Sequence, residues 1–498
     1  MSEMTSDTDP SSKVSRRSRL VRGGVVMTLV SVANRISSFI AQLFLGQLLF
    51  PEEFGLFAIA VGLTNIGAAV RSALQPVLIG HLEHDHAAFD RTYRTTMTGL
   101  WLLAAVGVAG SGLIESTLRA PGLQPLLIIL LVTMPFQVLG GFGMARISHS
   151  LEFNSVGKAQ TAVPLARHIS TVGFAFAGLG PLSFALGGVV SVAAELATLS
   201  RYTSLVVRPG LFSAQTIADI RSSVSRFTSG IDRRWIWGSA IALNLAASGR
   251  YPVAAIWTTK QVIGLYYFAG GLTAAFWLPL YLAVNTVLVP GFVTLKTKAE
   301  RRDRTMETVE TFAVLGVLLF NGLSVMIVPL THLMWAGKWD SAIPALLALS
   351  LFAPLQFIHP VVHAIQRGTG AWNLYMLDIS AYAVLTIIAA SIGAYIGGLA
   401  SLALTVVLAE VIVTFGGLVA VSRLFDIRIP DIIRVSVGPW LLGLVGLGAA
   451  HLIHPLNDPD IGASLLRLPV FGVLTLLLVA VPYRRLLIGL AQSMLSRS

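Results

Sequence analysis

Residues 55–80 read GLFAIAVGLTNIGAAVRSALQPVLIG, an apolar run that contains one charged residue, Arg71. A transmembrane helix needs about 20 mostly apolar residues, because the hydrocarbon core is about 30 Å thick and a helix rises about 1.5 Å per residue. The run is long enough to cross a bilayer and therefore predicts a membrane-spanning helix.

The whole chain has the composition of a membrane protein. Of its 498 residues, 55% are hydrophobic and only 12% are charged, whereas soluble domains carry roughly 25% charged residues. The mean hydropathy is +0.76. We predict an all-α polytopic membrane protein with about fourteen transmembrane helices. They are expected over residues 23–49, 55–80, 95–118, 122–145, 158–178, 181–207, 229–249, 263–292, 308–329, 341–366, 373–396, 397–421, 436–454 and 465–482.

The charges predict an orientation. The formal net charge is +11, and most lysines and arginines fall in loops that this topology places on one side. The positive-inside rule explains this distribution without nucleic acid binding. Residues 1–22 are expected to form a basic cytoplasmic tail before a retained first helix, because the following apolar run is too long for a signal-peptide core. An even helix count places both termini in the cytoplasm, with the chain in the bacterial inner membrane.

The sequence lacks the residues and motifs that several classes of enzyme and ATP-driven pump require. The chain has no cysteine, which excludes thiolate catalysis and cysteine-ligated metals. The predicted outer loops are too short for a periplasmic domain, and no Walker A, dinucleotide-binding or nucleophile-elbow motif is present. We therefore expect a transporter without a cofactor, driven by an ion gradient or by facilitated flipping, and not an enzyme.

Two patterns recur about 210 residues apart. Gly55-Leu56-Phe57 returns 209 residues later as Gly264-Leu265-Tyr266. The prolines and glutamine of helix 4 return 219 residues later in helix 10, as Pro125, Pro135 and Gln137 and as Pro344, Pro354 and Gln356. Chance recurrence in apolar helices is the alternative interpretation.

Six helices separate the members of each pair, so a duplication would give parallel repeats. We predict two six-helix bundles, at residues 23–225 and 226–421, with two further helices at 422–498. Such bundles suit alternating access to a central cavity. Prolines inside the helices, such as Pro354 and Pro360, are expected to let them bend.

Arginines within the predicted spans are candidate binding residues, because a charge inside the membrane is costly. They are Arg35, Arg71, Arg167, Arg233 and Arg234. Guanidinium groups facing a cavity would attract a phosphorylated cargo, since they bind phosphate oxygens in pairs. For Arg233 and Arg234 the alternative is that the side chains reach the cytoplasmic interface.

Three acids also fall within the predicted spans, at Glu195, Glu410 and Asp378. A buried carboxylate that alternately binds a proton and pairs with arginine could couple transport to an ion gradient. Each glutamate could equally be a static partner of an arginine. His359 and His363 are one helical turn apart but lack the acidic partner of the H-E-x-x-H motif, so a packed or interfacial role is favoured and no metal site is expected.

Three segments resemble a known family. They are LFPEEFGLF at 49–57, IGLYYFA at 263–269 and WAGKWDSAIP at 335–344. Their order and spacing resemble those of the motifs in the polysaccharide-exporter, or flippase, branch of the multidrug/oligosaccharidyl-lipid/polysaccharide (MOP) exporter superfamily. Arg250 is a departure, because many relatives have an acidic residue there.

The resemblance implies translocation of undecaprenyl-diphosphate-linked oligosaccharide for exopolysaccharide, capsule or O-antigen. It also implies a polysaccharide polymerase and a chain-length regulator as partners. Three alternatives stay open: a drug or metabolite antiporter, a peptidoglycan-precursor flippase, and a membrane enzyme acting on the lipid carrier, such as a polymerase, ligase or acyltransferase.

Overall fold

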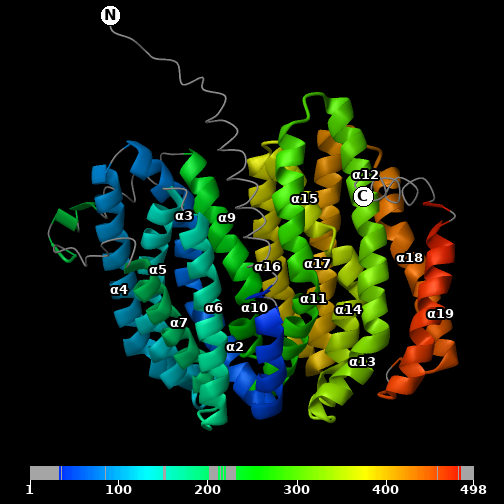
Figure 1. The fold of residues 1–498 in the computed structure, drawn as a ribbon, viewed down its shortest axis with the longest axis horizontal. Coiled ribbons are helices and arrows are strands. Elements are labelled where there is room, and N and C mark those ends of the chain that lie inside the picture. Colours follow the sequence, from blue (N-terminus) through cyan, green and yellow to red (C-terminus); the bar gives the residue numbers. More distant parts are fainter. Residues whose placement is uncertain are drawn as a thin grey trace, which may run out of the picture.

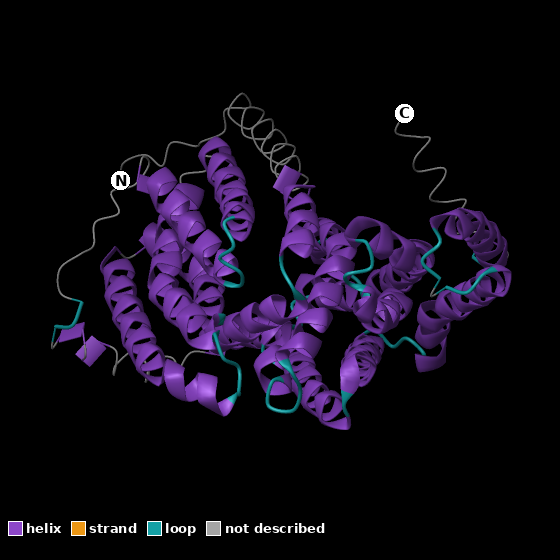
Figure 2. Cartoon of the chain, turned by 90° about the horizontal axis from the view of Figure 1, so that it is seen from below, coloured by secondary structure: helices purple, strands orange, loops and turns teal. Residues whose placement is uncertain are grey.

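A computed structural model describes residues 33–34, 36–84, 86–149, 153–200, 211–213, 215–216, 218–219, 231–456, 458–480 and 482–483. Within these residues the chain consists of helices and the loops that join them, without a strand (Figures 1 and 2). The all-α fold predicted from the sequence is confirmed.

The helices follow one another closely. The first half contains α2 (Pro51–Thr64), α3 (Ile66–His84), α4 (His86–Thr117), α5 (Leu123–His149), α6 (Phe153–Phe176) and α7 (Leu182–Ser200). The second half contains α9 (Ile231–Ser248), α10 (Arg250–Ala254), α11 (Lys260–Val293), α12 (Lys298–Gly316), the π-helical turn η1 (Val317–Asn321), α13 (Gly322–Trp335), the 3-10 turn η2 (Asp340–Ala342), α14 (Ile343–Gln356), α15 (His359–Gly368), α16 (Trp372–Ile396), α17 (Gly398–Leu424), α18 (Ile429–Ile453) and α19 (Ile461–Ala480).

The molecule is a multi-pass membrane protein. Among the described residues, 8 helices are long and apolar enough to cross a membrane, or 9 if α2 and the start of α3 form one bent span. Large apolar side chains face outward, including Val106, Ile169 and Leu452 at 71%, 71% and 87% exposure, as expected where lipid is the solvent. The count of fourteen stays a prediction.

Two spans are broken near polar or proline residues. The axis bends by 47° between α2 and α3, where the Asn65 amide donates to the Ser248 hydroxyl of α9 at 3.0 Å. The second break separates α14 from α15 and lies between Pro354 and Pro360. Proline removes a backbone donor and clashes with the preceding turn, which accounts for this interruption of the helix. That the prolines let the helices bend stays a prediction.

Two reciprocal glycine contacts join α2 to α11. A β-carbon at Gly55 would lie 1.8 Å from the carbonyl oxygen of Lys260, and one at Gly264 would lie 1.6 Å from that of Pro51. Lys260 follows Pro51 by the same 209 residues that separate the glycines. The two contacts are thus equivalent under the predicted repeat, which they support.

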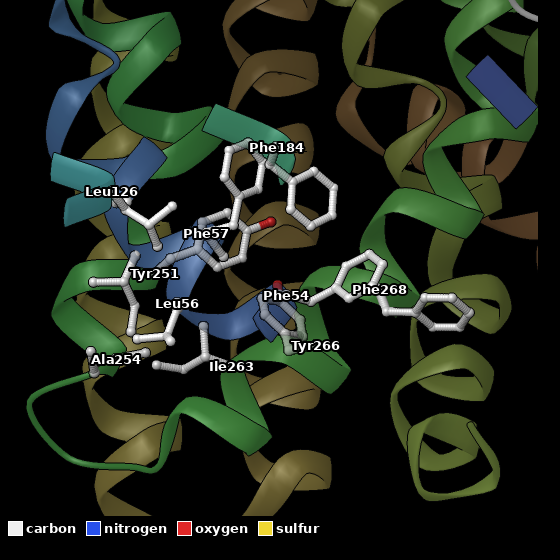
Figure 3. Packing of buried hydrophobic residues seen from close by; sticks show 14 of the residues in the cluster. Phe54, Leu56, Phe57, Leu126, Phe184, Tyr251, Ala254, Ile263, Tyr266 and Phe268 are labelled. Carbon is white, nitrogen blue, oxygen red and sulfur yellow. The ribbon is translucent and has the colours of Figure 1, made fainter. Parts of the chain in front are cut away.

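The three resembling segments meet in one buried aromatic cluster. Trp339 stacks on Phe268 with ring centroids 3.7 Å apart and meets the edge of Phe54 at 5.2 Å; Figure 3 shows Phe54 and Phe268 within this core. The indole of Trp339 donates to the carbonyl of Gly46 at 2.9 Å, and that of Trp335 to Leu43 at 3.1 Å. These motif residues therefore hold the fold together.

In Figure 1, α3–α7 lie on the left with α9 beside them, α11–α17 lie to their right, and α18 with α19 lies at the right-hand edge. There α18 packs against α12, and α19 packs against α13. Helix α9 contacts both α3 and α16, so it connects the halves. The exact boundaries of the two predicted bundles stay a prediction.

Candidate substrate cavities

A cavity of about 330 Å³ lies among α2, α3, α5, α6 and α7. Apolar residues make part of its wall. Its polar lining residues are Thr64, Asn65, Arg71, Gln137, Arg167, Ser191 and Glu195. Three of the residues singled out from the sequence, Arg71, Arg167 and Glu195, therefore share one site.

Arg71 and Glu195 form a two-point ion pair in this cavity. The Arg71 guanidinium donates to the two carboxylate oxygens at 2.8 and 2.5 Å and to the carbonyl oxygen of Gln137 at 2.8 Å. The side chain of Arg71 is 32% exposed, whereas that of Glu195 is 5% exposed. The carboxylate thus anchors an arginine that still faces the cavity.

Glycines of α5 make room for this pair. A β-carbon at Gly140 would lie 2.6 Å from Glu195 Oε2, and one at Gly141 would lie 3.1 Å from Arg71 Cγ. The sequence Gly140-Gly141 therefore allows two large charged side chains to enter between α3, α5 and α7.

Arg167 enters the same cavity from α6. Its side chain makes no hydrogen bond or ion pair to the part of the chain that the structure describes, and the residue is exposed. It contributes a positive charge that protein groups described here do not neutralise.

A second cavity of about 460 Å³ lies among α9, α10, α11 and α14–α17. In it, Arg250 donates to Glu410 Oε1 at 2.9 Å. The same carboxylate accepts from the Gln356 amide at 2.5 Å and from the Tyr382 hydroxyl at 2.9 Å. The Arg250 guanidinium also lies 5.8 Å from the ring centre of Tyr266, within the range of a cation–π contact.

The two cavities use equivalent acids and different arginines. Glu195 and Glu410 occupy α7 and α17, the predicted last helices of the two repeats, and Gln137 and Gln356 accompany them from α5 and α14. The arginine comes from α3 in the first cavity and from α10 in the second. Sequence reasoning missed Arg250 as a cavity residue, because it lies in a predicted outer loop beside a helix end.

Asp378 lies in a different cluster from the two glutamates. Its Oδ2 is 2.9 Å from His359 Nε2 and 2.8 Å from His363 Nε2, and all three residues are buried, at 8%, 8% and 4% exposure. The acidic partner absent from the local histidine motif thus comes from α16. The sequence signal available was the pair of histidines at one-turn spacing followed by an acid in the next span.

The other predicted arginines cannot be placed in a site. Arg35 lies outside the described residues, as do the side chains of Arg233 and Arg234 in α9. Their role in binding stays a prediction.

Comparisons with known proteins agree with the resemblance of the motifs. The model of the family described as "Polysaccharide biosynthesis protein" matches residues 44–344, more than half of the chain. The lipopolysaccharide biosynthesis protein WzxC of Escherichia coli (strain K12) is 25% identical over 359 residues, covering 69% of each protein.

Solved structures share the fold. Lipid II flippase MurJ, in an inward closed conformation, has a TM-score of 0.70 and 13% identity over 92% of this chain and 99% of that chain. An inward-facing multidrug resistance MATE family transporter of the MOP superfamily has a TM-score of 0.52 and 17% identity, over 82% and 96% of the two chains. At these identities the likeness shows the fold alone. Because the family model spans residues 44–344, which include all three resembling segments, the chain belongs to the family described as polysaccharide biosynthesis protein.

Proposed function

We propose that this protein is a flippase that translocates undecaprenyl-diphosphate-linked oligosaccharide across the bacterial inner membrane for surface polysaccharide biosynthesis. The observation that carries the proposal is the first cavity, where a partly exposed Arg71 and an Arg167 without a described partner lie together. A diphosphate supplies the negative charge and the paired oxygens that guanidinium groups bind.

The charge balance of the cavities favours an anionic cargo. Glu195 and Glu410 are each held by an arginine, so neither carboxylate is free to attract a cationic drug. Arg167 adds a further positive charge to the first cavity. This balance supports lipid-linked sugar over a drug or metabolite antiporter.

In the proposed cycle, the diphosphate and first sugars enter from the cytoplasm toward Arg71 and Arg167 while the lipid tail stays in the bilayer. Movement of the two halves then exposes the headgroup outward, with no covalent step. Both termini lie in the cytoplasm in this scheme. A polysaccharide polymerase would receive the cargo, with a chain-length regulator acting after it.

Ion coupling by Glu195, Glu410 and Asp378 is a further part of the proposal, and the contacts divide these residues into two classes. The glutamates have the geometry of static partners that orient arginines. Asp378 has two titratable partners instead of an arginine, so it is the better candidate for an exchangeable ion.

The function is tested by counting lipid-linked oligosaccharide on each leaflet with a probe that reaches only the periplasmic face. Cells lacking the gene would be complemented with the wild type, with the double variant R71A/R167A, or with R304A. Arg304 is a matched control because it is exposed and pairs only with nearby Glu307 in the described contacts. We expect cytoplasm-facing oligosaccharide to accumulate with the double variant when its protein level is matched to the wild type, and not with R304A.

Other outcomes would replace the proposal. If completed units reach the periplasmic face without the gene and remain unpolymerised, a membrane enzyme is indicated. If the peptidoglycan precursor accumulates instead, the protein is a flippase for that cargo.

A further inference from the structure

Asp378 differs from the other two buried acids in how its charge is balanced. Glu195 and Glu410 each contact an arginine, whereas in the described part of the chain the ionic partners of Asp378 are His359 and His363. A buried carboxylate needs a compensating positive charge. The cluster can obtain it from a proton on an imidazole or from a bound metal ion.

We propose that His359, His363 and Asp378 form a binding site for a divalent transition metal ion. Zn²⁺ is the ion that we would use to test it. Both Nε2 atoms approach the same carboxylate oxygen, at 2.9 and 2.8 Å. The potential ligand atoms all lie within 4.8 Å of one another. Balancing the carboxylate charge with a proton would involve only one imidazole, whereas three converging ligand atoms suit a metal ion. Two imidazoles and a carboxylate favour zinc over the oxygen-preferring Mg²⁺ and Ca²⁺.

Two neighbouring helices supply the three groups. His359 and His363 are one turn apart on α15 and share a face, with ring centres 4.1 Å apart. Asp378 approaches from α16. Gly417 of α17 leaves space for the carboxylate, because a β-carbon there would lie 2.9 Å from Asp378 Oδ1.

Metal binding requires the three side chains to adjust. Zinc bonds to nitrogen and oxygen are about 2.0–2.2 Å long, so ligand atoms of a tetrahedral site lie about 3.3 Å apart. The present separations of 2.8 and 2.9 Å are shorter by about half an ångström. Binding would need the side chains to rotate until all three ligand atoms, which now lie within 4.8 Å of one another, reach this spacing.

The surroundings leave a coordination position open. Both histidines line the second cavity, so a water molecule could supply the fourth ligand. The nearby Arg367 donates to the carbonyl of His363 at 3.3 Å, and its guanidinium lies 5.3 Å from the ring centre of Tyr375.

A metal ion here would tie α15 to α16 and so restrain one wall of the second cavity. This inference does not depend on the identity of the cargo. Zinc binding is measured on the purified protein, so failure of the site and failure of the proposed flippase function give separate results.

The test uses the full-length protein in nanodiscs, stripped with a chelator and titrated with ZnCl₂ against a chromophoric zinc indicator. We expect one zinc per chain, with affinity at least about tenfold weaker in D378N and in H363Q. H332Q is the matched control, because His332 pairs with Asp340 at 3.0 Å where both side chains are more than 40% exposed. Its zinc affinity should equal that of the wild type.

Thermal unfolding supplies a second readout, since a ligand that binds only the folded state raises its stability. Zinc should raise the unfolding midpoint of the wild type and of H332Q but not of D378N or H363Q. If one of the two site variants does not fold, the other decides. The proposal is overturned if the wild type binds no zinc, or if H332Q abolishes binding while D378N and H363Q retain it.

Discussion

Gly55 and Gly264 face each other where α2 packs on α11. A β-carbon on Gly55 would lie 3.1 Å from the amide nitrogen of Gly264, and one on Gly264 would lie 2.8 Å from that of Gly55. Each glycine thereby admits the backbone of the other helix, as small residues do at close helix contacts in membranes. A pair of equivalent glycines in reciprocal contact is what a pseudo-two-fold axis between the halves requires.

Replacing Gly264 with alanine should destabilise the protein. The added methyl would collide with the carbonyl oxygen of Pro51, and overpacking of this kind costs about 1–3 kcal/mol. Thermal unfolding of the purified protein measures the loss. G270A is the control on the same helix, because nothing lies within 4 Å of its new β-carbon. Equal losses in the two variants would contradict the close contact.

Removing Arg71 should reduce stability by up to about 3 kcal/mol, because Glu195 would stay buried without its partner. The cost is limited by the one-third exposure of Arg71. The double variant R71A/E195Q should recover most of this loss, which thermal unfolding would measure. If the arginine binds cargo, export should remain defective in the stable double variant. Restored export would assign the pair a purely structural role.

Breaking the Arg250–Glu410 pair should cost more stability than breaking the Arg71–Glu195 pair, since its side chains are only 17% and 9% exposed. We expect R250A to cost about 3–5 kcal/mol, as for a broken buried ion pair. R250A/E410Q should be more stable than R250A alone, and the difference between the single and double variants measures the coupling. A smaller loss for R250A than for R71A would argue against the burial of this pair.

Replacing Trp339 with phenylalanine keeps the aromatic stack on Phe268 but removes the donor to the Gly46 carbonyl. Leaving a buried acceptor unpaired costs about 1–3 kcal/mol, so the unfolding midpoint should fall. Trp372 is 49% exposed, and W372F should change stability by less than about 0.5 kcal/mol. An unchanged unfolding midpoint in W339F would show that the hydrogen bond to Gly46 does not contribute and that stacking on Phe268 is sufficient.

Much of the fold could be predicted because membrane insertion depends on local composition. The hydropathy of residues 55–80 is enough to predict a membrane-spanning helix, and Arg71 is the one charged residue in it. The 209-residue spacing indicated from the sequence that Gly55 and Gly264 are equivalent positions, and the structure shows them in reciprocal contact. The break at Asn65 was not predicted, because no proline marks it, and the hydrogen bond beside it joins Asn65 to Ser248, 183 residues away.

The candidate sites divide in the same way. From the sequence alone came the all-helical membrane fold, the family resemblance and the charges within the predicted spans, Arg71, Arg167, Glu195, Glu410 and Asp378, since each stands out against apolar neighbours. Tertiary structure alone decided their partners: Arg250 reaches Glu410 across 160 residues, and Asp378 meets two histidines of another helix. Hydropathy is a sum over neighbouring residues, whereas an ion pair depends on how distant helices pack, and no local pattern encodes that distance.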